Sequence, residues 1–180
     1  VKPLDKNHDN YIDTLYAGDT GGNLWRFNIM DPSTTNWTAN KVFSSNPGAD
    51  GSRGRKIFYE PSAYVDEQGA VRLYFGTGDR EHPLNTAVVD RMYGLIDRGQ
   101  TTGAAINESN LVDVTDDTLQ SLTATQAQID ALVSQLTSTA KYGWYIRLNQ
   151  DAGEKVLSPA LLYNQVVIYT TYSPTTTAST

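Results

Sequence analysis

Short runs in which apolar and polar residues alternate recur along this chain, and most of them end in small or acidic residues. Alternation with a period of two is typical of strands that bury one face. The first two runs, over 14–19 and 23–29, are separated by Gly21 and Gly22, which supply the positive φ that a tight turn needs. The sequence therefore predicts a β-hairpin over 14–29.

The same strand–turn–strand pattern appears twice more, and further strand-like runs lie between the repeats. The ranges are 41–45, 57–65 and 71–78 around a turn at 66–69, 91–97, 143–148, and 155–163 and 166–172 around Asn164 and Gln165. Repeats spaced by roughly 50–90 residues favour propeller blades that carry insertions. We therefore expect an all-β fold, a partial β-propeller of about three blades, with Trp25 and Trp144 in the blade cores.

One segment has a helical period instead. Between 123 and 138, the apolar residues Ile129, Leu132, Val133 and Leu136 recur at i, i+3, i+4 and i+7, and Thr125 with Gln128 can form a capping box. This pattern predicts a single amphipathic helix, inserted between blade strands within residues 98–140 and packed on the body of the domain.

Composition narrows the class of protein. The 180 residues carry a net charge of -6 and no cysteine, so disulfides and thiolate chemistry are excluded and a nucleic-acid partner is disfavoured. No apolar run approaches the roughly 20 residues of a membrane-spanning helix. The chain starts at Val1, and we expect it to be a mature or proteolysed piece of something longer, with a flexible linker at 46–56 and a flexible tail at 173–180.

Oxygen-bearing side chains are densest near the start of the chain, at Asp5, Asn7, Asp9 and Asp13. Three carboxylates in one short loop repel one another unless a cation balances them. Ca²⁺ takes six to eight oxygen ligands at about 2.3–2.6 Å, and Tyr11, whose side chain faces away, can still offer its carbonyl oxygen. Residues 5–13 therefore predict a calcium loop, and the alternative is a solvated turn rich in Asp and Asn.

The loop differs from an EF-hand. Counted from Asp5, the sixth position holds Asn10 where that motif needs Gly, and the twelfth holds Tyr16 where it needs a bidentate Glu. Asn tolerates a left-handed backbone, so the turn survives, and Asp13 becomes the expected closing ligand. A strand, and not a helix, follows.

Residues suited to catalysis are scattered. His8 and His82 are isolated, and no phosphate loop, zinc motif or nucleophile elbow is present in the sequence. Asp19, Asp79 and Asp97 follow strands, where Asp commonly closes a turn. We expect no enzyme activity and no catalytic residue.

Several segments together resemble one known family. They are the loop followed by TLYAGDTGGNLWRFN (14–28), then KIFYEPS (56–62), LYFGTGDRE (73–81), RMYGLID (91–97), GWYIRL (143–148), GEKVLSP (153–159) and VIYTTYSP (167–174). In this order they resemble the C-terminal β-propeller region of the PilY1/PilC-type adhesins associated with the tips of type IV pili. The resemblance covers most of residues 1–180 apart from 98–140.

This resemblance implies a modified quinoprotein-like propeller that binds Ca²⁺ through Asp5, Asn7, Asp9, the Tyr11 carbonyl and Asp13. Asn10 stands where the family usually has Gly. The implied function is pilus assembly, control of retraction and adhesion, outside the cell or on the bacterial surface, on the pilus (fimbrium).

The implied partners are pilins or minor pilins, or the missing remainder of a longer chain, together with a host or abiotic surface. Two alternatives stay open from the sequence. One is a propeller like that of the quinone (PQQ)-dependent dehydrogenases. The other is a filament subunit that associates through its exposed strand edges.

Overall fold

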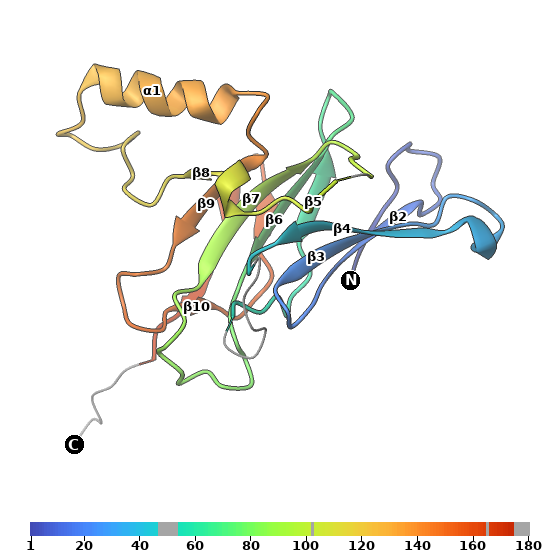
Figure 1. Cartoon of the computed structure of the whole chain (residues 1–180), viewed down its shortest axis with the longest axis horizontal. Helices are drawn as coiled ribbons and strands as arrows, with labels where there is room; N and C mark the ends of the chain where they lie inside the picture. The colour runs from blue at the N-terminus through green and yellow to red at the C-terminus, as the bar shows by residue number, and fades with distance from the viewer. Residues whose placement is uncertain (47–53, 102, 165, 175–180) are drawn as a thin grey trace.

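The computed structural model describes residues 1–46, 54–101, 103–164 and 166–174. Strands dominate and form two larger open sheets and two small ones, with one α-helix (Figure 1). The first sheet has the order β1-β2-β3-β4 and the second the order β5-β6-β7-β9-β8; β10 pairs with β13, and β11 with β12. The bounds are β1 Lys2–Leu4, β2 Thr14–Gly18, β3 Asn23–Asn28, β4 Thr38–Ser44, β5 Ser62–Val65, β6 Val71–Gly76, β7 Arg91–Asp97, β8 Val112–Asp113, β9 Gly143–Arg147, β10 Lys155–Val156, β11 Leu161–Tyr163, β12 Val166–Ile168 and β13 Thr171–Tyr172.

The first sheet confirms the hairpin predicted over 14–29. β2 and β3 pair antiparallel, and Gly22, with φ of 77°, lies in the turn between them. Leu24 and Arg26 are buried, whereas Trp25 is only half-buried because it lies on the other face of β3. The prediction that Trp25 belongs to a blade core was therefore wrong: strand alternation gives that place to its neighbours.

The second sheet depends on a close approach between two strands. Gly94 of β7 lies opposite Trp144 of β9, and a Cβ at Gly94 would overlap the Trp144 indole. Trp144 is half-buried on the outer face of this sheet, so it too lies outside the core. The strands expected over 91–97 and 143–148 are confirmed.

The core lies between the two larger sheets. Phe43 of β4 meets Phe75 and Tyr93 edge-on, with ring centroids 5.7 and 4.9 Å apart. The other buried members of this cluster are Tyr16, Leu24, Val42, Ile57, Val71, Leu73, Leu95, Ile106 and Leu111. Face-to-face burial of this kind fixes the register of both sheets, because a shift of one residue would expose the apolar face.

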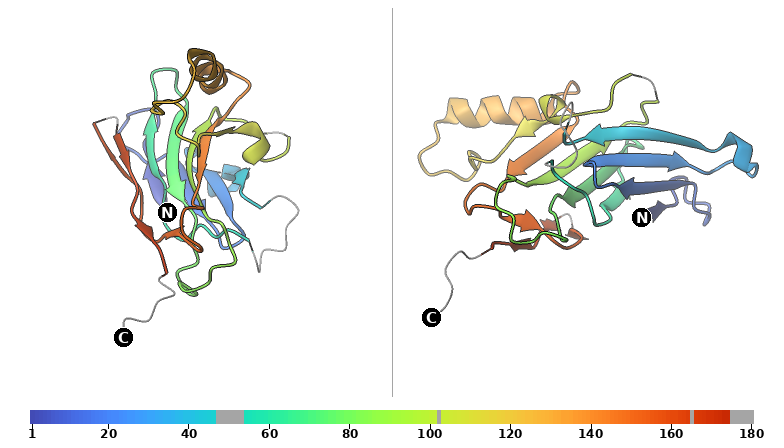
Figure 2. Two further views of the ribbon diagram at one scale, coloured as in Figure 1. Left: turned by 90° about the vertical axis from the view of Figure 1, so that its left-hand side faces the viewer. Right: turned by 60° about the horizontal axis from the view of Figure 1, so that its bottom comes forward.

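The hairpin β11–β12 lies against the outer face of the second sheet, beside β5 (Figure 2). The hydroxyl of Tyr169, which follows β12, donates to the carbonyl oxygen of Tyr93 at 2.6 Å. The hairpin predicted around Asn164 is confirmed by the pairing of β11 with β12.

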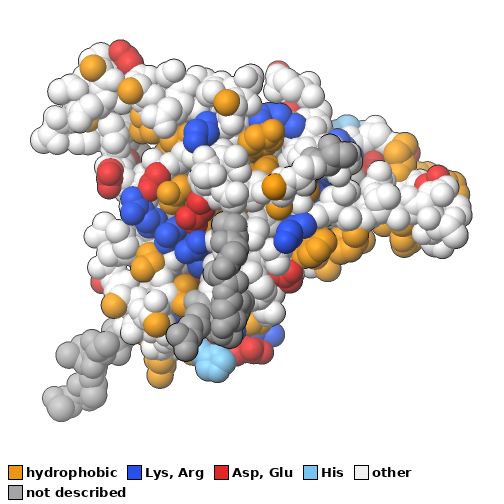
Figure 3. All heavy atoms as spheres, viewed as in Figure 1, with side chains coloured by type: hydrophobic (Ala, Val, Ile, Leu, Met, Phe, Trp, Pro, Cys, Tyr) orange, Lys and Arg blue, Asp and Glu red, His pale blue; other side chains and the backbone are white. Residues whose placement is uncertain are grey.

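The predicted helix is present as α1, Gln126–Thr137, and Thr125 and Gln128 form the expected capping box. However, α1 has no buried residue, and it stands away from the sheets at the upper left of Figure 1. The expectation that it packs on the body is therefore confirmed only in part. Leu132 and Leu136 are half-buried and line an open groove with Trp144 and Ile146 of β9, and apolar side chains show along the side of α1 toward the sheets (Figure 3).

Two short strands, β1 and β8, were not predicted because neither is long enough to show alternation. Most of the predicted linker (47–53) and most of the predicted tail (175–180) lie outside the described residues. Across the ranges that the structure describes, no helix has both the length and the apolar character needed to cross a membrane.

Candidate functional site

The acidic loop 5–13 connects β1 to β2, which are antiparallel neighbours. Its ends are closed by the Asp13 amide, which donates to the Leu4 carbonyl oxygen at 3.2 Å. His8 and Asn10 have positive φ values of 62° and 72°. The left-handed residues curl the chain tightly, as the spacing of the oxygen-bearing side chains predicted.

Inside the loop, the side-chain oxygens accept hydrogen bonds from backbone amides. Asp5 accepts from Asp9 N at 3.2 Å and from Asn10 N at 2.8 Å. Asp9 accepts from Tyr11 N at 2.9 Å, and Asn7 Oδ1 accepts from Asp9 N at 3.1 Å. Asp5, Asn7 and Asp9 therefore face the interior of the loop and hold its backbone in one conformation.

Asp13 lies at the base of the loop and is buried, with 6% of its surface exposed. Its Oδ2 accepts from Lys6 N at 3.0 Å and from Asn7 N at 3.2 Å, and its Oδ1 accepts from Thr14 Oγ1 at 2.8 Å. Asp13 thus joins the entry of the loop to its exit.

These residues fit a hard cation in chemistry and in backbone conformation. All the available donors are carboxylate, amide or carbonyl oxygens, which Ca²⁺ prefers, and the Tyr11 side chain is 77% exposed, so only its carbonyl can contribute. The side-chain oxygens bind amides and do not converge on one point: Asn7 Nδ2, for example, donates to Asp9 Oδ2 at 3.0 Å. Within the described residues, no group of three or more His, Cys, Asp or Glu is close enough to hold a metal ion.

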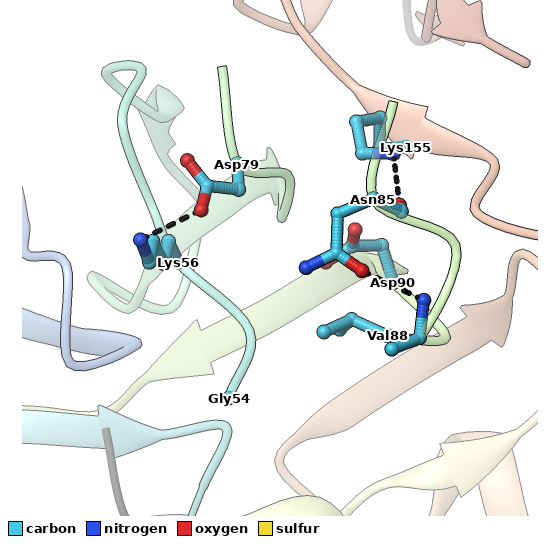
Figure 4. Close-up of a pocket in the computed structure, with 8 residues that line it drawn as sticks. Gly54, Lys56, Asp79, Asn85, Val88, Asp90 and Lys155 are labelled. Atoms are coloured by element: carbon cyan, nitrogen blue, oxygen red, sulfur yellow. Dashed lines mark hydrogen bonds and ion pairs between the residues drawn. The ribbon is translucent and has the colours of Figure 1, made fainter. Parts of the chain in front are cut away.

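A second polar centre surrounds a cavity of about 180 Å³, lined by the segment before β5, the connection between β6 and β7, and Lys155 of β10 (Figure 4). Lys56 Nζ lies 2.7 Å from Asp79 Oδ2, and His82 Nδ1 lies 3.0 Å from the same oxygen. Burial alone would raise the pKa of Asp79, but the hydrogen bonds from Lys56, His82 and the Glu81 amide lower it to about 2. His82, which the sequence showed as isolated from other candidate catalytic residues, is exposed and contacts Asp79.

The sequence did not reveal two buried charged residues at this cavity. Lys155 is 2% exposed, and its Nζ donates to the carbonyl oxygens of Pro83, Asn85 and Gly153. Asp90 is equally buried and accepts from Thr77 Oγ1 at 2.7 Å, and burial raises the pKa of Asp90 to about 6. Only the tertiary fold places these side chains inside, so no local signal could have found them.

Comparison with known proteins gives relatives from two bacteria. The chain is 28% identical over 191 residues to a "Type IV pilus biogenesis factor PilY1 homolog" of Xylella fastidiosa (strain Temecula1 / ATCC 700964), which covers 95% of this chain and 12% of the relative. It is 27% identical over 222 residues to "Type IV pilus biogenesis factor PilY1" of Pseudomonas aeruginosa (strain UCBPP-PA14), with 94% of this chain and 19% of the relative covered. No family model and no solved structure matches the chain.

These matches confirm the predicted resemblance: a PilY1-like relationship extends over almost all of this chain. The chain spans less than a fifth of the length of these curated relatives, between 12% and 19%.

Proposed function

We propose, from the PilY1-like relationship, that this chain is part of a calcium-binding component of a type IV pilus system. Its role would be in pilus assembly, in control of retraction and in surface adhesion. The relatives are named for type IV pilus biogenesis, and their alignments cover 94–97% of this chain, which supports a role in that process. The chain would act outside the cell, on the pilus, with pilins or minor pilins and a host or abiotic surface as partners.

The fold supports a portion of a β-propeller in this proposal. The two larger sheets pack face to face, and the hairpin β11–β12 lies on the outer face of the second sheet, as consecutive blades do. The outward side chains of that hairpin are apolar and exposed: Leu161, Tyr163, Val166 and Ile168. We propose that the remainder of a longer PilY1-like chain covers this face.

The single observation that carries the calcium proposal is the folding of loop 5–13 around its own carboxylates. Asp5, Asn7, Asp9, Asp13 and the Tyr11 carbonyl would hold the ion. The positive charge of bound Ca²⁺ would offset the mutual repulsion of the three neighbouring carboxylates. The chain's own residues already provide the curled backbone, because His8 and Asn10 adopt positive φ.

The loop is well placed to influence the rest of the domain. Asp13 is followed directly by Thr14, the first residue of β2, and two residues later the Tyr16 hydroxyl donates to Asp97 of the second sheet at 2.8 Å. Fixing the loop therefore fixes the start of β2 and its link to β7. We propose that cation occupancy adjusts partner affinity through this connection.

We propose a binding role without catalysis. Among the described residues, the charged groups around the 180 Å³ cavity make structural contacts: Asp79 with Lys56 and His82, Asp90 with Thr77, and Lys155 with three carbonyl oxygens.

Calorimetric titration of Ca²⁺ into the purified chain tests the proposal. We expect saturable binding that is lost in Asp9→Ala and retained in Asp31→Ala. Asp31 is a matched control because it is also exposed and also caps a turn, by accepting from Ser33 N, but lies outside the loop. Absence of binding by the wild-type chain, or equal binding by both variants, would refute the calcium site.

A further inference from the structure

A polar cleft of about 380 Å³ opens beside the acidic loop. It lies at the end of the first sheet where Thr14, Asn28 and Thr38 pair across three strands. Its walls come from three places: the inner face of β2, β3 and β4, the loop residues Lys6 and Asn7, and the segment after β7 at Gly99 and Thr101. All of these lining residues belong to the described part of the chain.

The register of the sheet arranges the cleft residues in two rows across three strands. Asn28 of β3 faces Thr14 of β2 and Thr38 of β4. In the next row, Arg26 faces Tyr16 and Asn40 in the same way. Directly opposed residues of one face are about 5 Å apart at Cβ, so the sheet presents hydroxyl, amide and guanidinium groups at fixed spacing.

The polar groups at the floor of the cleft are buried and already hydrogen-bonded. Arg26 Nη1 lies 2.7 Å from Asp97, Arg26 Nη2 donates to the Gln100 carbonyl oxygen at 2.8 Å, and the Tyr16 hydroxyl donates to Asp97. Arg26, Tyr16 and Thr14 are all buried, at 8%, 1% and 6% exposure. The deep end therefore supports the cleft and does not need a ligand to hold it.

The mouth of the cleft has hydrogen-bonding capacity to spare. Among the described residues, the Thr38 hydroxyl, Asn28 Nδ2 and Lys6 Nζ have no hydrogen-bond partner, and Asn40 Nδ2 has only a long contact of 3.5 Å to the Thr101 carbonyl oxygen. Met30, which is 64% exposed, adds an apolar surface at the rim.

The charges of the cleft balance. Of the lining residues, Lys6 and Arg26 are cationic and Asp13 is anionic, and the charge of Arg26 is offset by Asp97, which lies behind it and is buried. A site without net charge attracts a free anion or cation only weakly. The hydroxyl and amide groups of an uncharged ligand can both donate hydrogen bonds to such a site and accept them from it. Sugars combine such hydroxyls with an apolar C–H face.

We propose that this cleft binds a neutral saccharide. Its hydroxyls would be held by Asn28, Thr38 and Asn40, and its apolar face would rest against Met30. The site adjoins the calcium loop, since Asn7 and Asp13 line both, but the residues proposed to hold the sugar lie outside that loop. Saccharide binding in this cleft would give the proposed adhesive role a chemical target.

Titration followed by amide NMR tests this inference on the 180-residue chain. Glucose, galactose, mannose and N-acetylglucosamine serve as probes, each at millimolar concentrations, with and without Ca²⁺. We expect at least one sugar to shift the amides of residues 26–28, 38–40 and 99–101 saturably in either condition. Thr38→Ala and Asn40→Ala should each weaken binding about three- to tenfold, as for the loss of one hydrogen bond.

Lys41→Ala is the matched control, since Lys41 is on the same strand but does not line the cleft. The spectra themselves report whether each variant is folded. The proposal is overturned if no sugar shifts these amides, if Thr38→Ala and Asn40→Ala bind as tightly as the wild type, or if only sulfate, added as an anion probe, shifts them. Because binding is measured with and without Ca²⁺, failure here is separate from failure of the calcium site.

Discussion

Arg26 Nη1 lies 2.7 Å from both carboxylate oxygens of Asp97, and this contact joins β3 of the first sheet to the end of β7 in the second. Asp97 also accepts from the Tyr16 hydroxyl and from the Gly99 amide, each at 2.8 Å. The side chains are only 10% and 1% exposed. Two sheets that otherwise meet through apolar side chains are thus joined by one fully partnered ion pair.

Removing one member of this pair should be strongly destabilising. Arg26→Met leaves the Asp97 carboxylate buried without its counter-charge, and we expect the free energy of unfolding to fall by about 3–5 kcal/mol. Arg26→Met with Asp97→Leu should cost clearly less than the sum of the two single changes, because no charge then remains buried. Urea denaturation of the four proteins checks this, and simple additivity would contradict it.

Gly143, the first residue of β9, should not tolerate a side chain. Its φ is 120°, and a Cβ would overlap the carbonyl oxygen of Gly94, a backbone atom that cannot move aside. We expect Gly143→Ala to lower the free energy of unfolding by more than about 2 kcal/mol. Thermal or urea denaturation measures the loss.

The matched control is Gly69→Ala. Gly69 also has a positive φ, 78°, but a Cβ there would meet nothing within 4 Å. Gly69→Ala should therefore lower the free energy of unfolding by only about 1 kcal/mol, the cost of the left-handed backbone alone. Equal losses at the two positions would show that the contact with Gly94 does not matter.

Asp90 makes stability depend on pH in a defined window. Burial raises its pKa from 3.8 to about 6, so between these values the folded state holds the proton more tightly than the unfolded state. Stability therefore falls as pH rises through this window, by about 3 kcal/mol in all, and is level above it.

Asp90→Asn keeps an acceptor for Thr77 but has no proton to lose. We therefore expect the free energy of unfolding of Asp90→Asn, relative to that of the wild type, to increase as pH rises from 4 to 7. The pKa of Asp79 is lowered to about 2, so protonation of Asp79 changes stability only below this window, and it does so in both proteins. Parallel stability curves from denaturation at several pH values would contradict the prediction.

Asn10 should accept glycine but not a branched residue. Its φ of 72° is easy for Gly, tolerable for Asn and unfavourable for Val, and its amide donates to Asp5 at 2.8 Å. Asn10→Gly should leave stability unchanged or slightly higher, while Asn10→Val should cost about 1–3 kcal/mol. Thermal denaturation with Ca²⁺ and with a chelator would show whether the loop carries the effect.

Local patterns predicted the strands well where alternation was long and a turn residue stood at its end. The hairpin at Gly22 and the capping box of Thr125 and Gln128 are examples, because each depends only on residues close in sequence. The curl of loop 5–13 was predictable for the same reason, since Asp and Asn side chains bond to nearby amides.

Features set by distant residues were not predictable. The partner of Arg26 lies 71 residues away, and the burial of Lys155 depends on Pro83 and Asn85, about as far along the chain. Nor could alternation tell which face of β3 would be inside, so Trp25 was misplaced. Which charged side chains become buried is decided by sheet packing.

The excursion that carries α1 leaves and rejoins the same edge of the second sheet. Val114 N donates to the Tyr145 carbonyl oxygen at 3.0 Å, and Tyr142 N donates to the Asn110 carbonyl oxygen at the same distance, so the two ends of the segment are held together. The entropy of closing a loop grows only slowly with its length, by about 0.6 kcal/mol for each doubling. This segment can therefore gain or lose residues at little cost to the stability of the sheets.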